Sequence, residues 1–132
     1  MSQPEPAVVQ TASYQRGVVE KGYTNQYLDV DLSSGKISVE PIEEKIKKTF
    51  VGGKGFGAKL LYDLMPEGAD ALGPDNPLMV MTGPLTATPA PSMRACVVCK
   101  SPLTGTFLDS YFGGRFGPEI KYAGYDGIII TG

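Results

Sequence analysis

The spacing of hydrophobic and polar positions changes several times along this chain, and each spacing predicts a different element. Residues 27–32 (YLDVDL) alternate strictly, and residues 36–40 (KISVE) alternate again after a serine-serine-glycine turn. Two alternating runs joined by a short glycine-containing turn predict a β-hairpin. Ile42, Ile46 and Phe50 then recur every fourth residue among charged residues. This period predicts a short amphipathic helix whose charges form a solvated face.

The middle of the chain predicts a glycine-rich loop, a second helix and a strand. The loop covers residues 52–57, and leucines line one side of a helix over 58–65 that Pro66 ends. Residues 78–82 form a short apolar run, which favours a strand. Residues 83–91 contain three prolines and predict a rigid loop.

The last third of the chain predicts strand, turn, strand, glycine loop, short helix and strand. Pro118 is predicted to open the helix, because proline suits the first helical position, and Gly124 ends it. Short strands joined by close turns predict an α+β fold rich in antiparallel β-structure. The predicted strands here lie at 93–100, 106–111 and 125–131, with the glycine loop at 112–117.

Composition limits the classes of protein that this chain can represent. Its 132 residues suffice for one modest core. A net charge of −2 argues against a nucleic-acid-binding protein, and the absence of histidine removes the commonest general base. We see neither a signal-peptide layout nor an apolar run long enough to span a membrane. With two cysteines and no export signal, we expect the protein to be cytoplasmic.

Residues 53–58 (GKGFGA) match the dinucleotide-binding pattern G-x-G-x-x-A. That motif requires a buried strand directly before it, whereas the residues before it here predict an amphipathic helix. Two other interpretations remain open. The glycines can allow helices to pack closely, or the glycine-rich loop and Lys54 can lie near a cofactor phosphate.

Cys96 and Cys99 have the C-x-x-C spacing of many metal sites. On a strand, residues three apart point to opposite faces, so the two thiols are not expected to converge. The sequence offers no second cysteine pair and no histidine to complete a site. We therefore predict small buried side chains rather than a metal centre.

The segment around Gly113 and Gly114 carries the clearest signal for ligand binding. A glycine loop that runs into a helix exposes backbone N–H groups, and such groups bind anions. Arg94 and Arg115 lie close to this loop in sequence. Guanidinium groups pair with phosphate in a bidentate way, so we expect an anion here.

Four sequence blocks, in order, resemble the N-terminal domain of the tungsten-containing aldehyde ferredoxin oxidoreductase family. They are FVGGKGFGA at 50–58, GPLT at 83–86, KSPLTG at 100–105 and GGRFGPEIKYAGYDGIII at 113–130. The resemblance implies a cofactor-base domain over residues 22–132, apparently incomplete because it matches about the first half of the family's domain. Residues 1–21 are expected to form a flexible N-terminal tail, since they are polar and contain two of the prolines.

The resemblance also implies a cofactor, a bis-molybdopterin that carries tungsten or molybdenum, with Mg²⁺ at its phosphates. Arg94, Gly113 and Gly114 match positions that meet the pterin. Tyr111 is also expected to bind the cofactor. It stands where the family commonly has an asparagine that helps to hold the Mg²⁺, and tyrosine is a poor ligand for that ion, although its backbone carbonyl can still serve. The resemblance assigns the [4Fe–4S] cluster to parts of the enzyme outside this chain. No residue of this chain is predicted to be catalytic or to bind a metal through its side chain.

The implied activity is oxidation of aldehydes to carboxylic acids, with electrons passing through the cluster to ferredoxin. The expected partners are the remaining domains, or a large subunit, of the oxidoreductase. The alternative is a structural or cofactor-binding subunit that is not catalytic and completes a larger partner.

Overall fold

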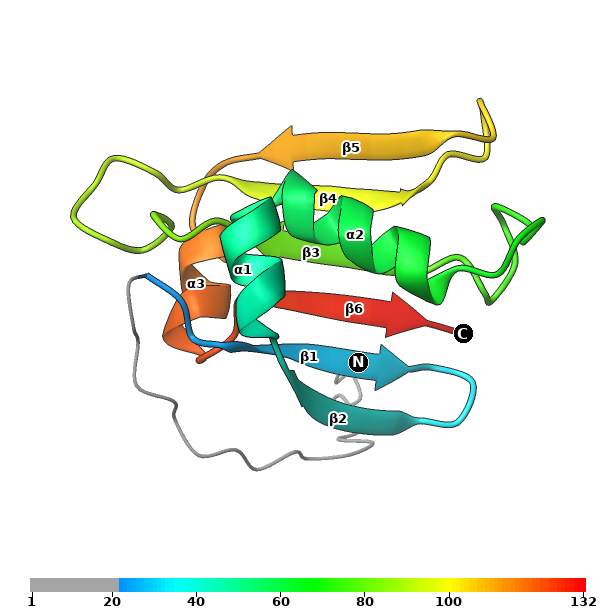
Figure 1. Cartoon of the computed structure of the whole chain (residues 1–132), viewed down its shortest axis with the longest axis horizontal. Helices are drawn as coiled ribbons and strands as arrows, with labels where there is room; N and C mark the ends of the chain where they lie inside the picture. The colour runs from blue at the N-terminus through cyan, green and yellow to red at the C-terminus, as the bar shows by residue number, and fades with distance from the viewer. Residues whose placement is uncertain (1–21) are drawn as a thin grey trace, which may run out of the picture.

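Residues 22–132, which the computed structural model describes, are built around one six-stranded sheet (Figure 1). The strand order is β2-β1-β6-β3-β4-β5, and every neighbouring pair is antiparallel except β1 and β6. This mixed sheet with three short helices confirms the predicted α+β class. The tail predicted at 1–21 lies outside the described residues. The elements are β1 (Gln26–Asp31), β2 (Lys36–Pro41), α1 (Glu44–Phe50), α2 (Lys54–Leu64), β3 (Leu78–Thr82), β4 (Ala95–Lys100), β5 (Phe107–Phe112), α3 (Phe116–Tyr122) and β6 (Gly127–Thr131).

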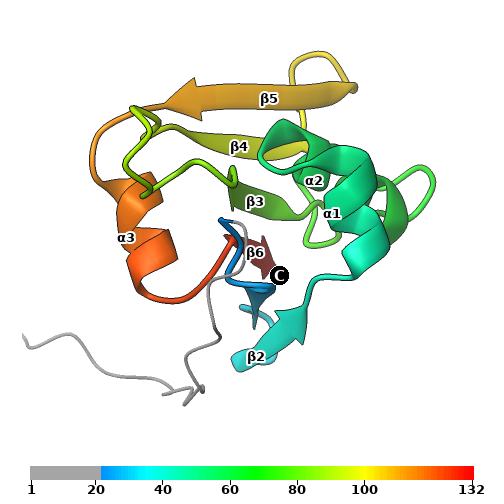
Figure 2. The same cartoon turned by 60° about the vertical axis from the view of Figure 1, so that its left-hand side comes forward.

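One face of the sheet is covered by α1 and α2, and the hydrophobic core lies between them and the central strands (Figure 2). Alternate residues of β3 and β4 point to this face, as the period of two requires. Burial of these side chains against α2 stabilises the domain. The buried cluster consists of Ile42, Phe56, Leu60, Leu61, Met79, Met81, Cys96, Val98 and Ile129.

The glycine-rich segment is mostly helical, so the loop predicted at 52–57 is wrong beyond Gly53. Helix α2 begins at Lys54 and contains two of the glycines. A Cβ atom on Gly55 would lie 2.1 Å from the carbonyl oxygen of Phe50, and one on Gly57 would lie 2.6 Å from Cγ2 of Val98. The glycines therefore let α2 pack directly on α1 and β4. Because α1 precedes the motif, the dinucleotide-binding interpretation is excluded.

Helix α3 lies on the opposite side of the sheet from α1 and α2 (Figure 2). It begins at Phe116, two residues before the predicted start, and Pro118 is buried in its first turn. Close packing sets its position, because a Cβ atom on Gly117 would lie 3.0 Å from the carbonyl oxygen of Met93 and 3.4 Å from Cβ of Ala95. None of the helices among residues 22–132 is long and apolar enough to cross a membrane.

The face of the sheet opposite α2 is also apolar. Val80 pairs with both Val97 and Ile128, and Leu78 pairs with Ile130. These side chains alternate with the core residues, and within residues 22–132 only α3 lies on their side of the sheet. They remain partly exposed, and Leu78 is 43% exposed. Sheets that are apolar on both faces are normally covered on both, so this face needs a further layer of structure.

Candidate functional site

A polar cavity of about 240 Å³ lies where α2 begins above strands β3, β4 and β5. It brings together two of the predicted cofactor-binding residues, Arg94 and Tyr111, and adds Lys54 from the first turn of α2. The lining residues include two cations and no carboxylate. A concave surface with this composition attracts anions, because none of the residues that line it is an acid.

The wall on the α2 side is a strained turn. Val51 has φ 64° and ψ −56°, and the N–H of Gly52 donates to the carbonyl of Phe50 at 2.7 Å. This is a γ-turn of the rare strained type, with a β-branched residue at its centre. The hydroxyl of Tyr23 donates to the Val51 carbonyl at 2.6 Å, and the N–H of Gly53 donates to the Thr82 carbonyl at 2.9 Å. These hydrogen bonds hold the turn in place, and therefore they set the position of Lys54 at the start of α2.

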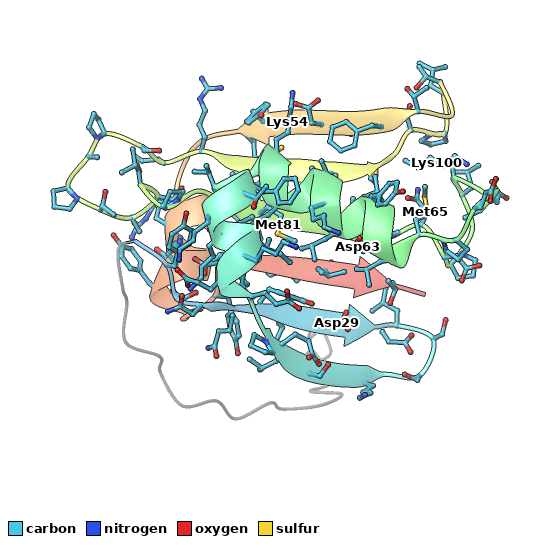
Figure 3. All side chains as sticks on the ribbon, in the orientation of Figure 1. Asp29, Lys54, Asp63, Met65, Met81 and Lys100 are labelled. Atoms are coloured by element: carbon cyan, nitrogen blue, oxygen red, sulfur yellow. The ribbon has the colours of Figure 1, made fainter. Side chains whose placement is uncertain are left out.

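Lys54 reaches from the start of α2 toward β4 and β5 (Figure 3). Its ammonium nitrogen lies 3.4 Å from a carboxylate oxygen of Asp109 on β5. The Lys54 side chain is 55% exposed and the Asp109 side chain 25% exposed. Ion pairs with this exposure are weak, so Lys54 remains free to turn toward a ligand.

The opposite wall contains Arg94, in the residue before β4 rather than within the strand as the sequence predicts. Its backbone carbonyl accepts a hydrogen bond from the hydroxyl of Thr86 at 3.2 Å, and that hydroxyl in turn accepts one from the N–H of Gly83. Thr86 thus ties the proline-rich loop to Arg94. Within residues 22–132 the guanidinium group makes no hydrogen bond or ion pair, so its five donors are available to a ligand.

The floor of the cavity holds the thiol of Cys96 and the phenol of Tyr111. Burial raises the pKa of Cys96 and the nearby Asp109 carboxylate raises it further, while a hydrogen bond with Tyr111 acts in the other direction. The pKa of Tyr111 is also raised, first by burial and then by Cys96. Both groups are therefore neutral at pH 7. The charge of the lining comes from Lys54 and Arg94 alone.

Gly113 and Gly114 lie beside the cavity and do not line it. The β4–β5 ladder ends at the pair Ala95 and Phe112, so Gly113 and Arg94 are the next residues on the two strands. A Cβ atom on either glycine would meet nothing within 4 Å, and Gly114 has a φ of +85° that favours glycine. This exposed pair leaves room for a ligand to extend out of the cavity along the backbone.

The side chains of the two C-x-x-C cysteines lie on opposite faces of β4, as the alternation of a strand predicts. Cys96 is buried in the core cluster, and Cys99 lies on the other face of β4. Within the described part of the chain, no three His, Cys, Asp or Glu side chains come close enough to hold a metal ion. The side chains that line the cavity also provide no carboxylate for Mg²⁺, which prefers oxygen ligands, so a magnesium site built from these side chains does not fit.

Residues 27–132 match the family described as aldehyde ferredoxin oxidoreductase, N-terminal domain. The chain belongs to this family. It is 43% identical over 112 residues to the tungsten-containing aldehyde ferredoxin oxidoreductase of Pyrococcus furiosus, across 84% of this chain and 18% of that enzyme. It is also 40% identical over 113 residues to the aliphatic sulfonate oxidoreductase, WOR-like subunit, of the same organism. The chain thus spans less than a fifth of the curated relatives it matches.

One solved structure is similar to this chain in both fold and sequence. The active-site complex BamBC of benzoyl coenzyme A reductase, in complex with 1,5-dienoyl-CoA, matches with a TM-score of 0.82 and 38% identity. The match covers 84% of this chain and 17% of that one. Membership of the family implies further domains beyond those that this chain supplies.

Proposed function

We propose that this chain is part of a bis-pterin oxidoreductase that carries tungsten or molybdenum, and that residues 22–132, an incomplete domain of that enzyme, help to bind the pterin. The observation that carries this proposal is the cavity itself, where Lys54 and Arg94 converge without any carboxylate in the lining. The exposed pair Gly113 and Gly114 lies beside it. A cofactor with phosphate groups and a flat ring system suits a cationic cavity that continues along an open glycine backbone.

The residues of this chain would bind and orient the cofactor, and the cofactor would supply the redox chemistry when bound. Arg94 would hold a phosphate with a fork of N–H donors. The neutral phenol of Tyr111 would donate a hydrogen bond to the same group. Mg²⁺ at the phosphates, as the resemblance implies, would take its protein ligands from backbone carbonyls or from other parts of the enzyme.

For the complete enzyme we propose oxidation of aldehydes to carboxylic acids. Electrons would leave through a [4Fe–4S] cluster, held outside this chain, to ferredoxin in the cytoplasm. The identity to tungsten-containing aldehyde ferredoxin oxidoreductases supports this reaction. Relatives named for an aliphatic sulfonate and for benzoyl coenzyme A carry a similar domain, so the substrate is selected by other domains.

The alternative is a structural or cofactor-binding subunit that completes a larger partner. The apolar sheet face around Val80, Val97 and Ile128 supports a large partner or further domains under either proposal. We expect the purified chain alone to show no oxidation of a simple aldehyde with a viologen dye as acceptor. Turnover above a metal-free blank would contradict this expectation, and turnover that appears only with the partner would support the catalytic proposal.

The pterin proposal is tested in the assembled enzyme by replacing Arg94 with alanine and, separately, Gly114 with valine. A charge-assisted hydrogen bond contributes about 1.5–3 kcal/mol, so Arg94→Ala is expected to weaken pterin retention roughly ten- to a hundredfold. Gly114→Val places a branched side chain where φ is positive and where the pterin would lie. The measurement is pterin and tungsten content per folded protein.

Arg115→Ala is the matched control, because Arg115 is another arginine near the loop but pairs with Glu119 outside the cavity. It is expected to keep full cofactor content. If Arg94→Ala and Gly114→Val also keep full occupancy while circular dichroism is unchanged, the cavity does not bind the cofactor.

A further inference from the structure

The cavity has a second cation besides Arg94, and the sequence alone leaves its role open. Lys54 lines the cavity together with Arg94, from the opposite wall. The two cations come from parts of the chain that are 40 residues apart, at the start of α2 and just before β4. Their convergence on one cavity is a property of the fold and not of a local sequence motif.

Asp109 is the only carboxylate paired with either cation among the described residues. It lies on β5, two residues before Tyr111, and its carboxylate is 3.4 Å from the Lys54 ammonium. It is not one of the residues that line the cavity. Asp109 thus holds one side of the Lys54 ammonium while Lys54 lines the cavity, and the exposed pair can exchange this partner at low cost.

We propose that Lys54 is an anion-binding residue of the site and that Asp109 competes with the bound anion for it. The proposal rests on the proposed function, since the natural anion would be a phosphate group of the cofactor. A phosphate carries more charge than one carboxylate and offers more acceptor oxygens, so it would displace Asp109. Lys54 and Arg94 would then hold the anion from two sides, and Asp109 would set how tightly Lys54 holds it.

The competition predicts effects of opposite sign for two substitutions. Lys54→Met keeps the length of the side chain and removes the charge, so the full chain is expected to bind inorganic pyrophosphate about tenfold more weakly. Asp109→Asn removes the competitor and keeps the side-chain size, so pyrophosphate is expected to bind roughly two- to fivefold more tightly. Isothermal titration calorimetry of the full chain at low ionic strength measures both effects.

Lys59→Met is the matched control for Lys54→Met. Lys59 lies on the same helix and pairs with Asp63, away from the cavity lining. Its replacement is expected to leave pyrophosphate binding unchanged. Because Lys54 is exposed, Lys54→Met is also expected to keep the circular dichroism spectrum and melting temperature of the unsubstituted chain.

The outcomes separate this proposal from the pterin proposal. If Arg94→Met loses binding while Lys54→Met binds normally, the cavity binds anions but Lys54 does not take part. If Asp109→Asn weakens binding, Asp109 supports the site rather than competing in it, and the proposal is wrong. If no variant changes pyrophosphate binding, or the chain does not bind it at all, the role of Lys54 is rejected, and pterin content in the assembled enzyme decides the proposed function separately.

Discussion

Replacing Asp126 with alanine is expected to lower the free energy of unfolding by about 3–5 kcal/mol, the usual cost of leaving one partner of a buried ion pair alone. Asp126 is 1% exposed. Its carboxylate accepts hydrogen bonds from the ammonium of Lys121 and from the backbone N–H groups of Thr24 and Asn25. Lys121 also donates to the carbonyl of Gly22 at 2.7 Å. The substitution would leave a buried ammonium and buried N–H donors unsatisfied, and would release the segment that leads into β1.

The pH dependence of this loss identifies its cause. Burial lowers the pKa of Lys121, while attraction to Asp126 and the hydrogen bond to it act in the opposite direction. Without Asp126 the folded-state pKa of Lys121 would fall further below its unfolded value. Below that lowered pKa the folded state would carry the whole free-energy cost of burying a charged Lys121. This cost would disappear as pH rises toward the unfolded pKa of about 10.4, because Lys121 is then neutral in both states.

We therefore expect the difference in unfolding free energy between Asp126→Ala and the unsubstituted chain to shrink from pH 7 to pH 10. Denaturant titrations at several pH values measure this difference. Asp126→Asn keeps an acceptor for the N–H groups and removes the charge, so it measures the effect of the unpaired Lys121 ammonium alone. Asp63→Asn removes the partner of the more exposed Lys59 and is expected to cost little. A loss in Asp126→Ala that does not change with pH would show that the N–H groups, and not Lys121, dominate.

The parts of the fold that rest on local periodicity follow from the sequence. The hairpin of β1 and β2 alternates along both strands, and its turn contains a glycine with a φ of +71° at Gly35. Strands β3, β4 and β5 also lie within a few residues of their predicted positions. The sequence does not show which strands pair over long separations, and the parallel pair of β1 and β6 is not predicted from periodicity.

The errors fall where tertiary packing overrides local preference. The sequence suggests a loop at Gly55 and Gly57 because glycine disfavours helix, but close contact with Phe50 and Val98 requires glycine within α2. Asp126 and Gly127 form a dipeptide that is typical of turns, but Asp126 is buried in the fold and pairs with the buried Lys121. Single-residue preferences do not show which side chains a residue will contact in the folded chain.

In the candidate site, too, some residues can be predicted from the sequence and others only from the fold. The resemblance supplies Arg94, Tyr111, Gly113 and Gly114, and the structure gathers the first two in one cavity and places the glycines beside it. For Lys54 the sequence leaves two interpretations open, close helix packing of its glycine motif or a position near a cofactor phosphate. Its contribution depends on the packing of α2 against β4, which brings it over β5.

That packing is tested by replacing Gly57 with alanine. Helix propensity alone predicts that alanine would stabilise α2 by about 1 kcal/mol relative to glycine. The added Cβ would instead lie 2.6 Å from Cγ2 of Val98, whose side chain is fully buried. Overpacking of a core costs about 1–3 kcal/mol, so we expect a net loss of stability. Ala58→Gly, at the next position of α2, is the control that measures helix propensity without this contact.

The double variant Gly57→Ala/Val98→Ala assigns the loss to the one contact. Val98→Ala alone is expected to be destabilising, because it leaves a cavity beneath α2. With Val98 shortened, the methyl group at position 57 has room, so the combined loss should be smaller than the sum of the single losses by roughly 1 kcal/mol or more. Gly57→Ala should also weaken pyrophosphate binding, since a displaced α2 moves Lys54 from the cavity, and the double variant should recover it. Additive losses, with binding unchanged, would show that α2 is positioned by other contacts.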